Sequence, residues 1–64
     1  MKDELEGLVD RSSLARVLRA LQAVTDEKAE HIAENWQDHK LAREWARAAR
    51  AIDALATKIA RQGL

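Results

Sequence analysis

The chain has 64 residues, a formal net charge of zero, and no Cys, Pro, Phe or Tyr. A chain of this length forms at most one domain, residues 1–64, and its small core leaves a monomer marginally stable. The absence of Cys excludes disulfide bonds and thiolate metal sites, so self-association is the expected means of stabilisation. The composition is rich in the helix formers Ala, Leu, Arg and Glu and predicts an all-α protein.

The sequence carries no mark of a membrane or secretory protein. No apolar run reaches the roughly 20 residues that cross a bilayer as a helix. The first residues, MKDELEGLVD, are acidic and do not resemble a secretory signal. We therefore expect a cytoplasmic protein with no membrane partner.

Residues 1–12 are predicted to form an N-terminal segment that contains a short helix near Asp3–Val9. The apolar side chains of this segment can fold onto the rest of the chain, although Gly7 weakens a helix here. Ser12 or Ser13 can cap the helix that follows, because a hydroxyl oxygen accepts a hydrogen bond from a free backbone N–H group.

The first long helix is predicted at residues 13–34. Its main row, which is apolar except for Thr25 and Lys28, has the 4-3-4-3-4 spacing of a heptad pattern. This row consists of Leu14, Leu18, Leu21, Thr25, Lys28 and Ile32. A second row, repeating every seven residues, consists of Val17, Val24 and His31. Together the two rows make an apolar side wider than one neighbouring helix can cover.

An alternative interpretation breaks this helix at Thr25. The stretch Thr-Asp-Glu-Lys at residues 25–28 also has the form of a helix start, with a Thr cap and acidic residues in the first turn. A break there would give a three-helix domain. The heptad spacing continues through Thr25 without a shift, and this favours one continuous helix.

A short turn at residues 35–38 is predicted to precede a second long helix at residues 39–61. Asp38 can cap this helix, and Gly63 is placed to end it. The main apolar row again has the spacing 4-3-4-3-4. It consists of Leu41, Trp45, Ala48, Ile52, Leu55 and Ile59. The second row consists of Ala42, Ala49 and Ala56.

The rows of the two helices are mirror images of each other. Leu14 corresponds to Ile59 and Ile32 to Leu41, and in each such pair the residue numbers add to 73. An antiparallel hairpin that folds between residues 36 and 37 would place the two residues of each pair side by side, at the same distance from the turn. Connections this short are normal between antiparallel helices. Trp36 is expected to cover the end of the core beside this turn.

The wide apolar side predicts an interface with a second copy. Two helices alone leave much of such a surface in water, and a two-fold related copy would close it as a dimeric four-helix bundle with coiled-coil packing. The expected interface residues are Leu14, Val17, Leu18, Leu21, Val24, Ile32, Trp45, Ala49, Ile52, Leu55, Ala56 and Ile59.

Charge is distributed unevenly along the chain. Residues 1–38 hold five Lys/Arg against nine Asp/Glu, net −4, and residues 39–64 hold six against two, net +4. The basic side chains are expected on the outward side of the second long helix. They are Lys40, Arg43, Arg47, Arg50, Lys58 and Arg61. This row is a candidate for nucleic-acid binding, although acidic residues of the first helix can also pair with it.

The two histidines are candidate sites of chemistry. His31 lies four residues after Glu27 and three before Glu34, spacings from which a helical bundle can build a metal site. The second helix offers no acid opposite His31, so we expect no metal and no cofactor. Neither His31 nor His39 has a nucleophile nearby, and there is no Gly-rich phosphate loop, so we expect no enzyme.

The run KAEHIAENWQDHKLAREWARAARAIDAL, residues 28–55, resembles small uncharacterised helical proteins of bacteria and phages. The matching residues are Lys28–Ile32, Asn35–Asp38, Ala42 and Trp45. The resemblance implies a bacterial or phage source and implies no activity. The sequence as a whole predicts a non-enzymatic interaction or assembly module that binds itself and, in addition, a protein partner that the sequence does not identify.

Overall fold

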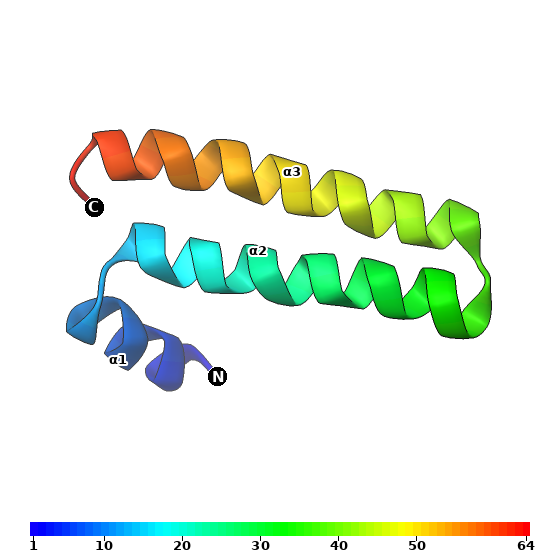
Figure 1. Cartoon of the computed structure of the whole chain (residues 1–64). Helices are drawn as coiled ribbons and strands as arrows, with labels where there is room; N and C mark the ends of the chain where they lie inside the picture. The colour runs from blue at the N-terminus through cyan, green and yellow to red at the C-terminus, as the bar shows by residue number, and fades with distance from the viewer.

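The computed structural model describes all 64 residues and contains helices but no strands (Figure 1). Helix α1 spans Lys2–Arg11, α2 spans Leu14–His31, and α3 spans His39–Arg61. One π-helical turn, η1, continues α2 over Ile32–Trp36. The all-α prediction is therefore confirmed, and α3 has the range that the sequence predicts.

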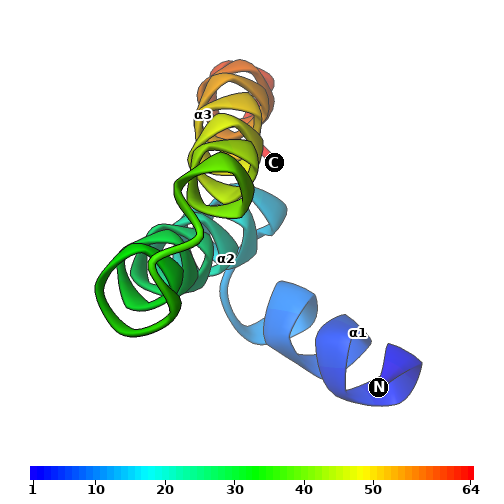
Figure 2. The ribbon, with the colours of Figure 1, turned by 90° about the vertical axis from the view of Figure 1, so that its right-hand side faces the viewer.

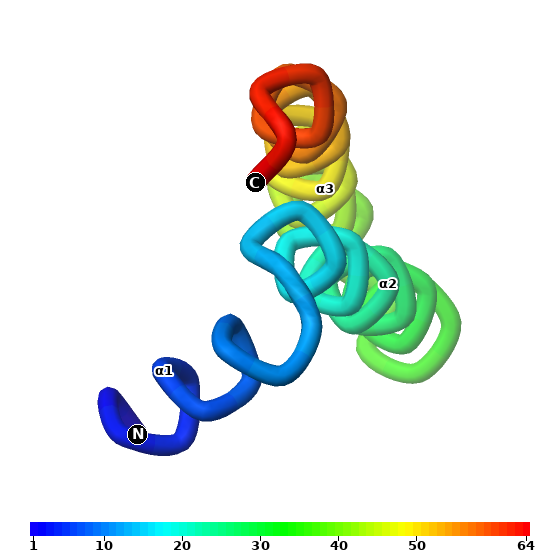
Figure 3. The backbone as a smooth tube through the Cα atoms, turned by 90° about the vertical axis from the view of Figure 1, so that its left-hand side faces the viewer, coloured from blue at the N-terminus to red at the C-terminus, as the bar shows by residue number.

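Helices α2 and α3 lie side by side and antiparallel, joined at one end by the short connection after η1 (Figures 1 and 3). Helix α1 contacts α2 but not α3, and it points away from the hairpin in the end-on view of Figure 2. No residue of α1 is buried. The hairpin of α2 and α3 is thus the folded unit, and α1 is an arm attached to its open end.

Side-chain caps begin both helices of the hairpin. The hydroxyl oxygen of Ser13 accepts a hydrogen bond from the backbone N–H of Arg16 at 3.1 Å. A carboxylate oxygen of Asp38 accepts one from the backbone N–H of Leu41 at 3.0 Å. Each bond satisfies a donor that has no partner inside its own helix. Both caps occupy the positions that the sequence predicts.

Helix α2 runs through Thr25 without a break, so the alternative three-helix interpretation is wrong at this position. The Thr25 side chain is buried, and its hydroxyl donates a hydrogen bond to the carbonyl oxygen of Leu21 at 2.7 Å. Such a bond to the preceding turn satisfies a hydroxyl inside a helix. Thr25 therefore acts as a residue of the helix interior and not as a cap.

The open end of the hairpin is closed by backbone hydrogen bonds. The carbonyl oxygen of Leu64 accepts the N–H of Leu14 at 2.6 Å and that of Ala15 at 3.4 Å. Gly63 has a φ of 82°, a conformation that costs glycine little and other residues much. The last residues can therefore turn back after α3 and meet the first free N–H groups of α2.

The turn is shorter than the predicted residues 35–38. Asn35 and Trp36 belong to η1, which leaves only Gln37 and Asp38 between helices. The Asn35 side-chain amide donates a hydrogen bond to the carbonyl oxygen of His31 at 3.1 Å. Asn35 thus bonds one turn back along the helix, which keeps it within the helical segment.

Trp36 does not cover the core, contrary to expectation. It remains 64% exposed at the turn end of the molecule. Its ring instead stands edge-on to the ring of His31, with 6.1 Å between the ring centroids and 69° between the planes.

Gln37 adopts a left-handed conformation with a φ of 54°. We expect Gln37→Gly to raise the free energy of unfolding by about 0.5–1 kcal/mol, because glycine avoids the left-handed cost but is freer when unfolded. Thermal unfolding followed by circular dichroism measures this change. Gln62→Gly is the matched control, because Gln62 has a right-handed φ of −80° and should gain nothing. Equal effects at both positions would contradict the assignment of strain to Gln37.

The core of the hairpin is built from small side chains. Its six buried residues are Thr25, Ala29 and Ile32 together with Ala42, Ala49 and Ala56. The expected main row of α3, from Leu41 to Ile59, is only half-buried or exposed. The alanine row, expected to flank it, lies at the centre of the contact instead, because small side chains let the two helices approach closely.

Candidate functional site

An apolar surface lies along one side of both helices and is called here the apolar face. It consists of Val17, Leu21 and Val24 of α2 and Leu41, Trp45, Ala48, Ile52, Leu55 and Ile59 of α3. Val24 is 58% exposed, Leu21 49% and Leu55 46%. At about 100° per residue, the 3- and 4-residue spacings hold each set on one stripe of its helix.

Five expected interface residues lie outside this face, three of them buried and two half-buried. Ile32, Ala49 and Ala56 are at most 2% exposed, because each is buried between α2 and α3. They hold the hairpin together and offer no surface to a second copy. Leu14 and Leu18 are half-buried near the same seam. The expected interface is corrected accordingly, and the remaining expected residues stay a prediction.

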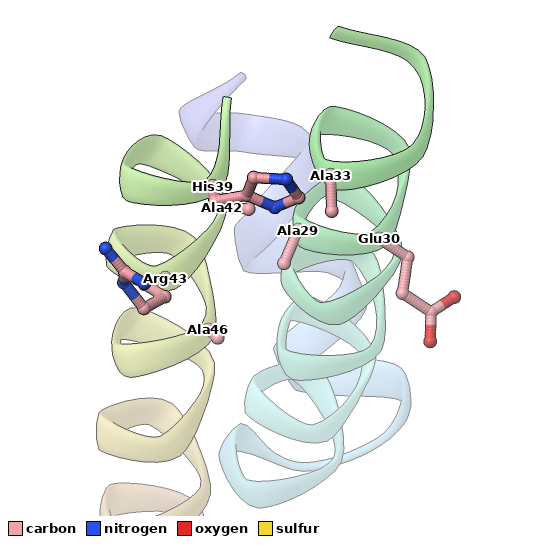
Figure 4. Close-up of a pocket in the computed structure, with 7 residues that line it drawn as sticks. All are labelled: Ala29, Glu30, Ala33, His39, Ala42, Arg43 and Ala46. Carbon is pink, nitrogen blue, oxygen red and sulfur yellow. The ribbon is translucent and has the colours of Figure 1, made fainter. Parts of the chain in front are cut away.

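The opposite side of the hairpin holds a groove of about 390 Å³ beside the turn (Figure 4). It is lined by Ala29, Glu30, Ala33, His39, Ala42, Arg43 and Ala46. The Glu30 and Arg43 side chains point away from it, and α1 lies behind the hairpin in this view. The groove floor is therefore alanine, and no buried polar atom lacks a hydrogen-bond partner.

The two histidines lie on opposite sides of the hairpin. His39 lines the groove of Figure 4, whereas His31 borders an open hollow on the apolar side together with Val24 and Lys28. The Nδ1 atom of His31 lies 3.0 Å from the side-chain nitrogen of Asn35. No three His, Asp or Glu side chains come together in a way that could hold a metal ion.

The basic residues of α3 are all exposed, as a stripe facing away from the buried alanines. None of them forms an ion pair, because the only two ion pairs are Met1 with Glu4 and Arg19 with Asp53. The acidic residues of α2 that were expected to neutralise this stripe form no ion pair with it.

Sequence inspection missed the polar bridge across the hairpin. The guanidinium of Arg19 pairs with Asp53 and also donates to the hydroxyl of Thr57 and the amide oxygen of Gln22, each at 2.8 Å. The numbers of Arg19 and Asp53 add to 72, close to the mirror relation of the apolar rows. That relation could have identified the pair. Because both side chains are about half exposed, the bridge adds at most about 1 kcal/mol.

A second hollow on the apolar side belongs to α3 and is lined by Leu41, Glu44, Trp45 and Ala48. The hollow on α2 is lined by Val24, Glu27, Lys28 and His31. The hollow on α2 therefore carries two opposite charges, Glu27 and Lys28, and the hollow on α3 carries one, Glu44. Neither Lys28 nor Glu44 has an ionic partner within the chain.

Comparison with known protein families, with curated proteins and with solved structures finds no match to this chain. The resemblance of residues 28–55 to small bacterial and phage proteins therefore stays a prediction. None of the three α-helices combines the length and the apolar character that crossing a membrane requires.

Proposed function

We propose that this protein is a non-enzymatic assembly module that binds a second copy of itself through the apolar face. The observation that supports this most strongly is that small side chains are buried while larger apolar side chains are exposed. The buried centre of the hairpin holds mainly Ala, whereas Leu21, Val24 and Leu55 stand half in water. A contiguous apolar surface of this kind is typical of a protein interface.

The energetics favour closure of this face by another helical pair. Only six of the 64 residues are buried, so the hairpin alone has little apolar burial to offset the entropy of folding. Burying a side chain such as Leu or Val adds roughly 1.5–3 kcal/mol. A second hairpin would cover much of this face beside α1, which lies on the same side of the molecule (Figure 4), and would give a four-helix bundle.

The pattern of the face supports a second copy as its partner. The apolar residues of α2 and of α3 follow the same alternation of three and four residues, the spacing with which helices of a bundle interlock. A two-fold axis brings one such face against an identical one. In such a dimer each copy supplies the same apolar face to the interface.

Sedimentation velocity at micromolar concentrations tests this proposal directly. We expect a dimer that dissociates on dilution, with a melting temperature that rises with protein concentration because association stabilises only the folded state. A species of monomer mass at every concentration, with unchanged helical content, would overturn the proposal.

Nucleic-acid binding is the second candidate, because six exposed basic side chains of α3 have no ionic partner. If the stripe contacts phosphates, the affinity for labelled duplex DNA or RNA falls as the salt concentration rises. A plot of log K against the logarithm of the salt concentration then has a slope of about −0.9 for each phosphate contact. The double variant Arg43→Ala, Arg47→Ala should then reduce that slope by about two. Fluorescence anisotropy measures both quantities.

Arg16→Ala provides the control for this experiment, because Arg16 is an exposed base on α2 outside the stripe. Its slope should equal that of the unmodified protein. No binding at low salt, or equal losses in the control and the double variant, would dismiss the stripe as a nucleic-acid site.

A further inference from the structure

We propose that Lys28 pairs with Glu44 of the second copy, so that α2 of one hairpin lies against α3 of the other with both turns at the same end. This inference rests on the proposed self-association and adds its orientation. Lys28 and Glu44 each border a hollow on the apolar side, one on each helix. The pair would form twice, once on each side of the two-fold axis.

The two charged residues lie at one level along the hairpin. Arg19 and Asp53, which bridge α2 and α3, have residue numbers that add to 72, and so do Lys28 and Glu44. Within one chain Lys28 and Glu44 nevertheless form no ion pair. Both side chains are exposed, and helical geometry places them on the side of the seam where the apolar face lies. Each is therefore available to the second copy at a matching height.

An axis parallel to the helices brings the two hollows together. It places α2 over α3 of the second copy, and each residue keeps its position along the axis. The hollow with Lys28 therefore meets the hollow with Glu44. The same arrangement sets Val24 opposite Ala48 of the second copy, because those numbers also add to 72. All neighbouring helices are then antiparallel, as is usual in bundles with short connections.

The other two-fold arrangement brings no acid of the second copy to Lys28. An axis perpendicular to the helices would place α2 against a reversed α2, and the spacing of Val17, Leu21, Val24 and Lys28 would set Lys28 beside Val17 of the second copy. Residues 11–25, which surround that position, contain no Asp or Glu. Lys28 would then gain no acid from the second copy and would keep only Glu27 of its own hollow, with which it forms no ion pair, and this disfavours the perpendicular axis.

Charge exchange between the two positions tests the orientation. Lys28→Glu would oppose Glu44 of the second copy, and Glu44→Lys would oppose Lys28, so each variant alone should dimerise about tenfold more weakly or worse. A mixture of the two variants restores an opposite-charge pair at both contacts. We expect the mixture to regain nearly the affinity of the unmodified protein and to form mixed dimers preferentially, as measured by sedimentation equilibrium and native mass spectrometry.

Glu30→Lys and Arg50→Glu are matched controls, because these exposed residues lie off the apolar face and undergo the same charge reversals. Their dimerisation, alone or mixed, should stay within a few-fold of the unmodified protein. Circular dichroism verifies that every variant remains helical. A dimer of the unmodified protein whose two variants fail to complement each other overturns the orientation alone. A monomer at all concentrations overturns both this inference and the proposed function.

Discussion

Replacing Val24 with Glu is expected to convert the dimer into monomers while the hairpin stays folded. Val24 is 58% exposed in the single chain and lies outside the six buried residues, so we expect the substitution to disturb the packing of α2 against α3 little. In the proposed dimer the Val24 side chain of each copy is covered by the other copy. The loss of about 1.5 kcal/mol or more of apolar burial per copy, together with a carboxylate that lacks a partner, weakens dimerisation about 100-fold or more.

Sedimentation velocity and circular dichroism together measure this outcome. Ala23→Glu is the matched control, because Ala23 is exposed on α2 one residue away and points about 100° from Val24. The control should dimerise like the unmodified protein. If Val24→Glu dimerised normally, the apolar face would not be the interface. If it lost its helical signal, Val24 would instead be required for the fold of the single chain.

The second large effect is expected at Ala56, where a Leu would force α2 and α3 apart. Ala56 is 0% exposed and lies in the row that brings the two helices close together. Three extra carbon atoms have no space there, and overpacking typically costs 1–3 kcal/mol. With so small a core to absorb the strain, we expect the melting temperature to fall by about 10 °C or more.

Thermal unfolding followed by circular dichroism checks this expectation. Ala54→Leu serves as the control, because Ala54 is exposed on the same helix and Leu is nearly as good a helix former as Ala. Its melting temperature should change by less than about 3 °C. Equal stability of the two variants would mean that α2 and α3 do not pack through the alanine row.

Several parts of the fold follow from local chemistry and could be predicted from the sequence. Ser13 and Asp38 begin helices because their side chains satisfy free N–H groups within three residues. The mirrored rows of the two helices indicate an antiparallel hairpin, because residues at equal distances from the turn then lie side by side on the two helices. These features depend only on neighbours along the chain or on spacing.

The candidate site could be predicted only in part. Val17, Leu21 and Leu55 lie on the exposed apolar face, as the sequence suggested for an interface. Ala49 and Ala56, expected at that interface, are buried inside the hairpin instead. Periodicity shows that two apolar rows lie next to each other on a helix, but it does not show which row faces the neighbouring helix.

The sequence by itself determined the helices, their caps and the antiparallel order of α2 and α3. Only the tertiary structure decided that Ala42, Ala49 and Ala56 form the centre, because close approach of two backbones depends on the volumes of facing side chains and not on periodicity. The same packing turned the larger side chains outward. It also brought Arg19 beside Asp53, 34 positions away.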